Sequence, residues 1–427
     1  MRRNESARSL LKIIMYGDDL GAVVADIGSF ATRIGFAGND VPQTHMPTAV
    51  GRKGQQNVFD GGLSTYSEGQ TLSQPVREGL IVDWDEYQQL WEYAIKNNLK
   101  VDLRDTPLLV AEKPYVSSND RIKLAELMFE RFQVPALFLS KDAVLECYSC
   151  GRTSGLAVDI GSSGTVITPV SDGWVEAKGV IRSVVGGRIM DAKMMEILSS
   201  ASGVAQEKAL RPACLRNHAS GSIDPALNAY LRLEIARNAK ESVCRMADTP
   251  LGENEAKFSA LSSVAYELPD GTSVNLGSER FAVSELLCDP SNISFENADL
   301  LSLGLDHTRD GALPCDAETG LPRLICDSTL RCDHDIQHAM TANIVVAGGG
   351  SAFEGLPERI RREVEKIVHV NAPTWKIKSV SPSPSERGLS AWLGGSILAS
   401  LGSFNEVWMT KAEYKEHGAV LCERKCP

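Results

Sequence analysis

One tetrapeptide occurs twice in this chain and constrains its fold more than any other feature. Asp-Ile-Gly-Ser stands at residues 26–29 and again at 159–162, each time after a short apolar run. An apolar run closed by such a turn is typical of a buried strand that delivers a carboxylate to the edge of a sheet. Glycine lets backbone N–H groups approach an anion closely, and aspartate holds a hydrated divalent cation. Two unrelated β-turns would give the same pattern, but the repeat favours two hairpins that hold a phosphate chain from opposite sides.

The length and composition are those of a globular protein with two domains, or with one large two-lobed α/β unit. The chain has 427 residues, of which 43% are hydrophobic and 23% are charged. Its formal net charge of −11 argues against an extended nucleic-acid-binding surface. No apolar run approaches the roughly 20 residues that a membrane helix needs, so we expect no membrane association. Ten cysteines without a compact spacing indicate reduced thiols, as in cytosolic or nuclear proteins.

A third glycine cluster lies in the C-terminal half of the chain. Residues 343–347 predict a strand, the glycine run 348–350 follows, and residues 356–364 have helical spacing with a proline in the first turn. This unit suits the close approach of a purine nucleoside, although plain connectors also use such glycines. Residues 1–17 predict a flexible tail. Residues 297–327, rich in Gly, Pro and Asp, predict a surface insertion in loop conformation.

With these parts in place, the chain resembles the actin family from about residue 18 to its C-terminus. Besides the two phosphate turns, the resemblance rests on Gly-Phe-Ala-Gly at 35–38, Glu-Leu-Pro-Asp-Gly at 267–271, Trp-Leu-Gly-Gly-Ser-Ile-Leu-Ala-Ser-Leu at 392–401 and Glu-Arg-Lys-Cys-Pro at 423–427. Within that family the chain is similar to the fourth class of nuclear actin-related proteins, which are subunits of chromatin remodellers and histone acetyltransferase complexes. The phenylalanine that follows the first turn and the Arg-Lys-Cys-Pro terminus carry this closer likeness.

The resemblance implies an α/β fold of the actin-like ATPase type, with two lobes, or four subdomains, around a nucleotide cleft. Subdomain 1 would comprise residues 18–47, 84–152 and 386–427, and subdomain 2 residues 48–83. Subdomain 3 would comprise residues 153–187 and 266–385, with the insertion 297–327, and subdomain 4 residues 188–265. The chain would cross between the lobes twice, so closure around a ligand could couple the cleft to the outer surface.

The resemblance also implies ATP and Mg2+ as ligands and assigns residues to both. Asp26 and Asp159 match the carboxylates around a hydrated magnesium ion. Arg33 stands where actins carry a phosphate-binding lysine, and it keeps the positive charge. The other positions that match nucleotide contacts are Gly28, Ser29, Phe30, Gly161, Ser162, Ser163, Gly187, Lys240, Glu241, Gly349, Gly350 and Phe353. For Lys240 and Glu241, a solvated pair on a helix is the alternative.

Three departures from the actin pattern bear on hydrolysis and on the base pocket. Asp142 occupies the position of the glutamine that holds the attacking water, and Val166 occupies that of its supporting histidine. A carboxylate beside a triphosphate adds repulsion, and valine cannot relay a proton. Gly388 replaces a lysine that packs on the adenine. We therefore expect ATP binding with slow or absent hydrolysis, in a protein that is not an enzyme and has no catalytic residue.

The expected function is that of a non-catalytic subunit in the nucleus, with some of the protein in the cytoplasm. It would pair with nuclear actin on an amphipathic helix of a remodeller ATPase or scaffold subunit, with histones or nucleosomes as further partners. A groove near Tyr148 and the C-terminal helices would receive the helix. The main alternative is a filament-forming cytoskeletal actin-like ATPase, against which stand Asp142, Val166 and the divergent segment 48–75. A sugar kinase or chaperone ATPase on the same fold is disfavoured by the actin-like C-terminus.

Overall fold

The computed structural model describes residues 21–201, 210–218, 222–253, 263–293 and 315–427. The predicted tail 1–17 and the first part of the predicted insertion lie outside the described residues. In the described part of the chain, no helix combines the length and the apolar character that crossing a bilayer requires.

The first large sheet is assembled around the first copy of the tetrapeptide. β1 (Val23–Ile27) pairs antiparallel with β2 (Ala31–Phe36) and parallel with β9 (Leu108–Glu112). The predicted strand before the first turn is therefore confirmed, and it lies in the middle of the sheet. The order across the sheet is β20 (Met409–Thr410), β10 (Ala136–Lys141), β9, β1, β2 and β3 (Thr44–Pro47).

The second large sheet repeats this pattern around the second copy. β11 (Gly155–Ile160) pairs antiparallel with β12 (Thr165–Ser171) and parallel with β18 (Ile344–Ala347), so both predicted strands form here. Each tetrapeptide thus lies where a central strand turns back into an antiparallel neighbour. The order is β17 (Cys315–Asp316), β14 (Ile181–Ser183), β12, β11, β18 and β19 (Ser379–Val380), with β13 (Trp174–Val175) paired to β12.

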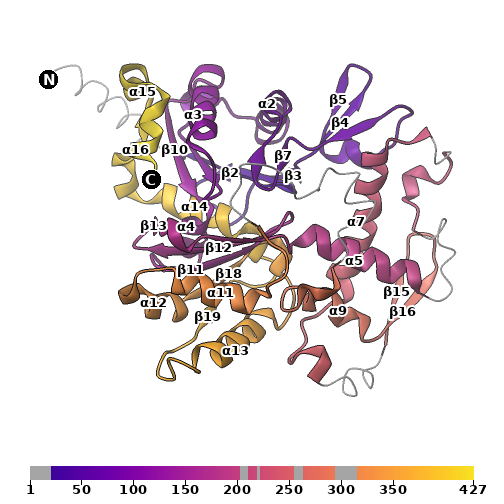
Figure 1. Ribbon diagram of the computed structural model, residues 1–427. Helices are drawn as coiled ribbons and strands as arrows, with labels where there is room; N and C mark the ends of the chain where they lie inside the picture. Colours follow the sequence, from indigo (N-terminus) through magenta and orange to yellow (C-terminus); the bar gives the residue numbers. More distant parts are fainter. Residues whose placement is uncertain (1–20, 202–209, 219–221, 254–262, 294–314) are drawn as a thin grey trace.

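Two helices lie between the sheets, and others cover the outer faces (Figure 1). α4 (Asp142–Ser149) and α14 (Ser390–Ser400) pack on each other, and together they contact strands of both sheets. At their crossing, a Cβ on Gly394 would overlap the carbonyl oxygen of Leu145, so the two backbones meet directly. The outer helices are α2 (Trp84–Tyr93), α3 (Ser118–Glu126), α15 (Lys411–His417) and α16 (Cys422–Lys425) on the first lobe, and α11 (Leu321–Leu330), α12 (His334–Thr341) and α13 (Leu356–Val368) on the second.

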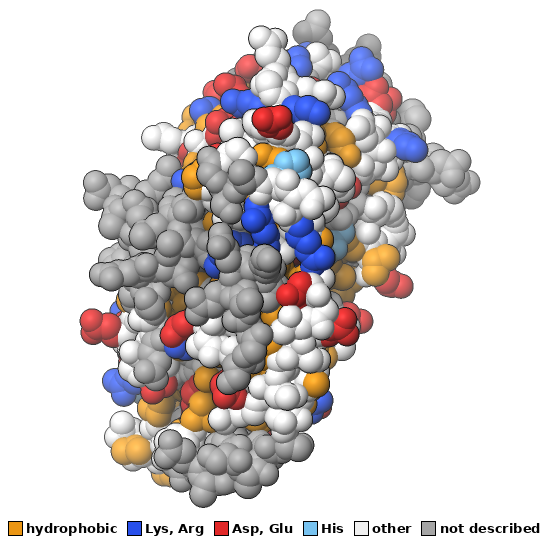
Figure 2. All heavy atoms as spheres, turned by 90° about the vertical axis from the view of Figure 1, so that its right-hand side faces the viewer, with side chains coloured by type: hydrophobic (Ala, Val, Ile, Leu, Met, Phe, Trp, Pro, Cys, Tyr) orange, Lys and Arg blue, Asp and Glu red, His pale blue; other side chains and the backbone are white. Residues whose placement is uncertain are grey.

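Two smaller units extend from the sheets on the right-hand side of Figure 1. The upper unit holds the sheet of β5 (Gln56–Val58), β4 (Val50–Lys53) and β6 (Thr71–Ser73), near the hairpin of β7 (Val76–Arg77) and β8 (Leu80–Ile81). The lower unit holds α5 (Gly187–Ser200), α7 (Pro225–Val243), α9 (Glu279–Glu285) and the hairpin of β15 (Val264–Glu267) and β16 (Ser273–Leu276). Figure 2 shows this side of the molecule, with Lys and Arg side chains gathered near its middle.

The buried apolar residues divide into two main clusters, one for each large sheet. The cluster of the first sheet contains the fully buried Trp91, Trp392 and Trp408. The cluster of the second sheet continues into α5 and α7. Each lobe therefore has a core of its own, as expected for a two-lobed α/β fold.

The structure corrects the prediction for the end of the insertion. Loop conformation is expected for residues 297–327, but in the described part β17 pairs with β14 and α11 begins at Leu321. Pro322 is compatible with the first turn of α11, because the N–H of that turn has no intrahelical acceptor. Leu324 and Ile325 are buried against the second sheet. The loop prediction is therefore wrong for residues 315–316 and 321–327, because burial of apolar side chains outweighs the local Gly and Pro content. Residues 317–320, between the strand and the helix, lie in neither, as predicted.

Candidate functional site

A cavity of about 540 Å³ lies between the lobes, at the carboxyl ends of β1 and β11. This volume is within the range of small-molecule sites. The first lobe contributes the turn at 28–30, and the second contributes the turn at 161–163. The other predicted residues that line the cavity are Asp26, Arg33, Asp142, Asp159, Gly187, Lys240, Glu241, Gly349 and Gly350. The fold thus brings together most of the residues that the sequence singled out.

Two of the predicted site residues lie elsewhere. Phe353 is 6% exposed and packs in the core of the second lobe, where its carbonyl oxygen accepts a hydrogen bond from Arg387. The structure therefore does not bring Phe353 to the cavity; Ala352 and Gly388 are among the residues that line that end. Tyr148, predicted for the partner groove, is half-buried at the end of α4 and outside the cavity.

The two tetrapeptide turns share their backbone geometry. The N–H of Gly28 donates to the carbonyl oxygen of Ala31 at 3.1 Å, and the N–H of Gly161 donates to that of Gly164 at 2.9 Å. The hydroxyl oxygen of Ser163 is buried and has no hydrogen-bond partner among the described residues. Because an unpaired buried hydroxyl destabilises a protein unless a ligand or water bonds it, this atom fits an anion bound at the second turn.

The first turn is held by contacts from the smaller units. The hydroxyl oxygen of Ser29 accepts the N–H of Gly79 at 2.8 Å, and the Ser29 carbonyl oxygen accepts a hydrogen bond from buried Arg188 at 3.1 Å. The guanidinium of Arg237 lies 4.0 Å from the centre of the Phe30 ring, a cation–π contact. Phe30 therefore connects the first turn to α7, across the cavity.

The two carboxylates predicted to surround magnesium each bond a basic side chain. Arg33 Nη1 lies 3.0 Å from Asp26 Oδ2, across the pairing of β1 and β2. Lys113 Nζ lies 2.5 Å from Asp159 Oδ2 and 2.6 Å from Asp142 Oδ2. A hydrated ion at Asp26 and Asp159 would have to share their carboxylate oxygens with Arg33 and Lys113. Arg33 lines the cavity, so it fits phosphate contact as well as neutralisation of Asp26.

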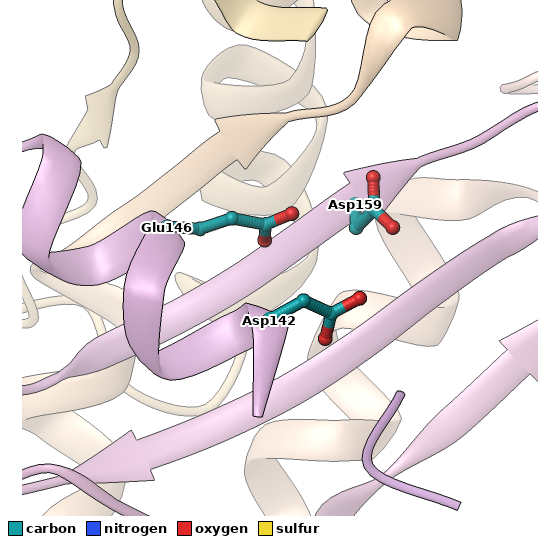
Figure 3. A group of neighbouring side chains, drawn as sticks. All are labelled: Asp142, Glu146 and Asp159. Carbon is teal, nitrogen blue, oxygen red and sulfur yellow. The ribbon is translucent and has the colours of Figure 1, made fainter. Parts of the chain in front are cut away.

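Asp142, Glu146 and Asp159 form a buried acidic cluster beside Lys113 (Figure 3). One carboxylate oxygen of each lies within 4.8 Å of the others. Burial raises the pKa of Asp142 to about 6 against the opposing effect of Lys113. Burial, together with the charges of Asp159 and Asp142, raises the pKa of Glu146 well above its usual range. Burial also disfavours the Lys113 ammonium, but the neighbouring carboxylates outweigh it and raise the pKa of Lys113.

Asp142 and Val166, which the sequence matches to the water-holding pair of actins, lie next to protein groups that occupy or replace their polar contacts. Asp142 Oδ1 accepts the N–H of Ala143 at 2.7 Å, and Asp142 Oδ2 bonds Lys113. Val166 is paired with Asp159 between β11 and β12, is 7% exposed and lines the cavity. The site therefore presents a lysine-bound carboxylate and a valine where a water would have to be oriented for hydrolysis.

The far wall of the cavity comes from α7. Lys240 is 6% exposed, and its Nζ lies 2.6 Å from Asp191 Oδ1. Lys240 is therefore held inside the wall and is not a solvated side chain, whereas Glu241 is exposed and lines the cavity. Gly388 has no side chain at the position where actins carry a lysine. A Cβ there would lie 3.8 Å from Arg33 Nη2, so space is left beside Arg33.

Sequence reasoning missed Lys113 and Glu146. Glu146 had a detectable signal, because it stands four residues after Asp142 on a helix and so shares its face. Lys113 follows β9 directly, and β9 lies beside β1 in parallel. Without knowledge of that pairing, the sequence gives no reason to connect Lys113 with Asp159, 46 residues later.

Comparison with known proteins agrees with this geometry over nearly the whole chain. A family model described as "Actin" matches residues 17–427. The chain is similar to proteins named "Actin-related protein 4" from Oryza sativa subsp. indica and subsp. japonica, each 33% identical over 97% of this chain and 100% of the relative. The protein of the same name from Arabidopsis thaliana is 32% identical over the same shares. With its two α/β lobes, its paired tetrapeptide turns and this match, the chain belongs to the actin family and has the actin-like ATPase fold.

Proposed function

We propose that this protein is an ATP-binding, non-catalytic actin-related subunit of nuclear chromatin-remodelling or histone acetyltransferase complexes. The observation that carries the proposal is its similarity to actin-related protein 4 over 97% of this chain and the full length of those relatives. ATP with Mg2+ is the proposed ligand pair of the cavity. Nuclear actin and an amphipathic helix of a remodeller ATPase or scaffold subunit are the proposed partners, with histones or nucleosomes as further ones.

The residues around the cavity support nucleotide binding. Backbone N–H groups of the two glycine turns and the unpaired hydroxyl of Ser163 suit phosphate oxygens. Arg33 and Lys113 bring positive charge to the same region. When bound, Mg2+ supplies charge neutralisation of the phosphates, and Asp26 and Asp159 would hold it through water. Glu241 is exposed and lines the cavity, and its carboxylate would accept hydrogen bonds from ribose hydroxyls.

The same residues support a protein without rapid turnover. A general base must be able to take a proton from water, or an amide must orient that water. Asp142 has both oxygen atoms bonded to protein donors, and Val166 has no polar atom in its side chain. We therefore propose that the nucleotide stabilises the closed cleft as a structural ligand.

An exposed apolar strip on the first lobe supports a helical partner. We define the strip as Ile397, Leu401 and Val407, which are 38%, 45% and 40% exposed. Ile397 lies in the last turn of α14, and Leu401, four residues later, directly follows the end of that helix. Tyr148 lies in the last turn of α4, which packs on α14. An amphipathic helix with apolar residues at i, i+3, i+4 and i+7 would cover these side chains.

A pull-down with a remodeller helix peptide and actin tests this part of the proposal. Leu401→Asp and Tyr148→Asp are each expected to release helix and actin, because a charge would be buried in the apolar contact. Val370→Asp is the matched control, since Val370 is 78% exposed and lies beyond the end of α13. Stabilisation by ATP verifies that each variant is folded. Full binding by both folded variants would contradict the proposed surface, and filaments formed by the parent protein alone, seen by light scattering, would favour a cytoskeletal ATPase.

A further inference from the structure

We infer that Ser383 is a phosphorylation site for a proline-directed protein kinase, and that a phosphate at this position weakens nucleotide binding in the cavity. The effect on the nucleotide rests on the proposed function, whereas the acceptor site itself does not. Ser383 stands directly before Pro384, in the segment that leads from β19 to α14. This segment reads Ser-Pro-Ser-Pro-Ser at residues 381–385.

Exposure singles out Ser383 among the possible acceptors. A proline-directed kinase modifies a Ser or Thr that directly precedes Pro. The chain has five such positions, and all of them lie within the described residues: Thr106, Thr168, Thr249, Ser381 and Ser383. Thr106 and Thr168 are buried, with 0% and 1% of their surface exposed, and Thr249 and Ser381 are half-buried. Ser383 is exposed, so a kinase reaches it without unfolding the chain.

The backbone at this position suits the active site of such a kinase. Residues 381–383 lie in neither a helix nor a strand, and a following proline favours extended conformation at Ser383. In the transfer, Ser383 Oγ forms a bond to the γ-phosphorus of ATP while the bond from that phosphorus to the β–γ bridging oxygen breaks, and ADP leaves. The hydroxyl proton passes to the catalytic-loop aspartate of the kinase.

The Ser383 hydroxyl is bonded to a carboxylate, so a phosphate in its place would be repelled. Ser383 Oγ donates to Glu386 Oε2 at 2.8 Å, and the N–H of Ser383 donates to the same oxygen at 3.2 Å. The carbonyl oxygen of Ser383 accepts the N–H of Glu386 at 2.9 Å, which closes a turn. A phosphoserine carries a charge of about −1.5 to −2 at pH 7. Phosphorylation therefore replaces a hydrogen bond by repulsion between two anions, and this repulsion opens the turn.

The turn that begins at Ser383 contributes one wall of the cavity. Its residues that line the cavity are Pro384, Ser385, Arg387 and Gly388. Arg387 is 5% exposed, and its guanidinium donates to the carbonyl oxygen of Ser351 at 2.6 Å. The carbonyl oxygen of Arg387 accepts the N–H of Gly348 at 3.0 Å, so the turn is tied to the glycine run 348–350. An opened turn displaces this wall, and the phosphate adds negative charge beside the cavity, where it repels a triphosphate. Both effects lower the affinity for the nucleotide.

Incubation of the full chain with ATP and a purified proline-directed kinase, followed by mass spectrometry, tests the acceptor site. Phosphate is expected on Ser383, and Ser383→Ala is expected to abolish its incorporation. Ser381→Ala is the matched control, because Ser381 belongs to the same repeat but is half-buried. This variant is expected to incorporate phosphate as the parent does. Circular dichroism verifies that each variant is folded.

Calorimetric titration with Mg-ATP, after removal of the kinase and its ATP, tests the effect on the nucleotide. The phosphorylated chain is expected to bind Mg-ATP about threefold more weakly than the unmodified chain, as for the loss of an exposed charge interaction. The difference should shrink at high salt, because exposed charges are screened. Glu386→Gln removes the repelled carboxylate, so phosphorylation of this variant is expected to weaken Mg-ATP binding less. Without nucleotide, the phosphorylated chain is expected to melt at a lower temperature, since its turn is opened.

The outcomes separate this inference from the proposed function. No phosphate on Ser383 of the folded parent, or equal incorporation into Ser383→Ala, would overturn the acceptor site. Equal affinity of the phosphorylated and unmodified chains for Mg-ATP would overturn the effect on the nucleotide. If the parent accepts phosphate on Ser383 but binds no ATP, the proposed nucleotide is contradicted and the melting temperature decides. A lower value in the phosphorylated chain then supports the opened turn, and an unchanged value overturns it.

Discussion

Replacement of Lys113 by methionine tests the electrostatic description of the cleft most directly. Methionine has a similar length and no charge. The Lys113 side chain is 21% exposed, and its Nζ lies 2.6 Å from Asp142 and 2.5 Å from Asp159. Removal of one partner from a buried ion pair destabilises a protein by about 3–5 kcal/mol, because the other charge stays buried without compensation. At about pH 8 we expect Lys113→Met to lower the free energy of unfolding by that amount.

The loss of unfolding free energy in Lys113→Met should become smaller as the pH falls. The pKa of Asp142 is about 6 in the folded protein and 3.8 in the reference state, so its ionised form destabilises the fold. This destabilisation is absent below the unfolded pKa and complete above the folded pKa. Lys113 lowers the pKa of Asp142, so the methionine variant will bind the proton at a higher pH than the parent. A protonated Asp142 needs no counter-ion, and we expect the loss to fall to roughly half at about pH 5.5.

The assay is urea unfolding followed by tryptophan fluorescence at about pH 8, 6.5 and 5.5, with the parent measured under each condition. Lys113→Arg, which keeps the charge, is expected to reduce the free energy of unfolding less than Lys113→Met does at every pH. The double change of Lys113→Met with Asp142→Asn should recover part of the loss, because the two residues are in contact. A loss below about 1 kcal/mol at pH 8, or an equal loss at all three values, would refute the reasoning.

Three further predictions concern the nucleotide and the helix crossing. Asp159→Ala is expected to lower the melting temperature and to abolish the stabilisation by Mg-ATP, typically a few kcal/mol at saturation; identical melting curves of the parent with and without ATP would contradict this. Phosphate release from ATP is expected near background, and Asp142→Gln with Val166→His is expected to raise it; brisk release by the parent would show that Asp142 acts as a base. Gly394→Ala is expected to reduce stability by about 1–3 kcal/mol or more, because the new Cβ overlaps the Leu145 carbonyl; an unchanged urea midpoint would show that the helices separate freely.

The parts of the site that are local in the sequence could be predicted from it. The two strand–turn units needed only an apolar run followed by Asp-x-Gly-Ser, because the turn residues and the strand are adjacent. The third glycine cluster and α13 were predictable for the same reason, with the proline of α13 in its first turn as expected. In each case one short segment contains both the strand and the glycine turn that lines the cavity.

The parts that depend on pairing between distant segments could not be predicted. Lys113 reaches Asp159 only because β9 lies beside β1 and because the two sheets face each other across the cavity. Phe353 follows the predicted glycine run but turns into the core, since burial of a phenylalanine outweighs a place on the cavity wall. α11 forms because its apolar side chains have the second sheet to cover, which the local composition does not reveal.

The two cleft aspartates differ in where their counter-ions are anchored. Arg33 stands on β2, the other arm of the hairpin that holds Asp26, so that pair moves as one body. Lys113 follows β9 in the first sheet, whereas Asp159 ends β11 in the second. Separation of the sheets must therefore break the bond from Lys113 to Asp159, while Lys113 keeps Asp142, which follows β10 in its own lobe. The bond from Lys113 to Asp159 is thus an ion pair that joins the two lobes, and opening of the cleft would leave Asp159 without its counter-ion.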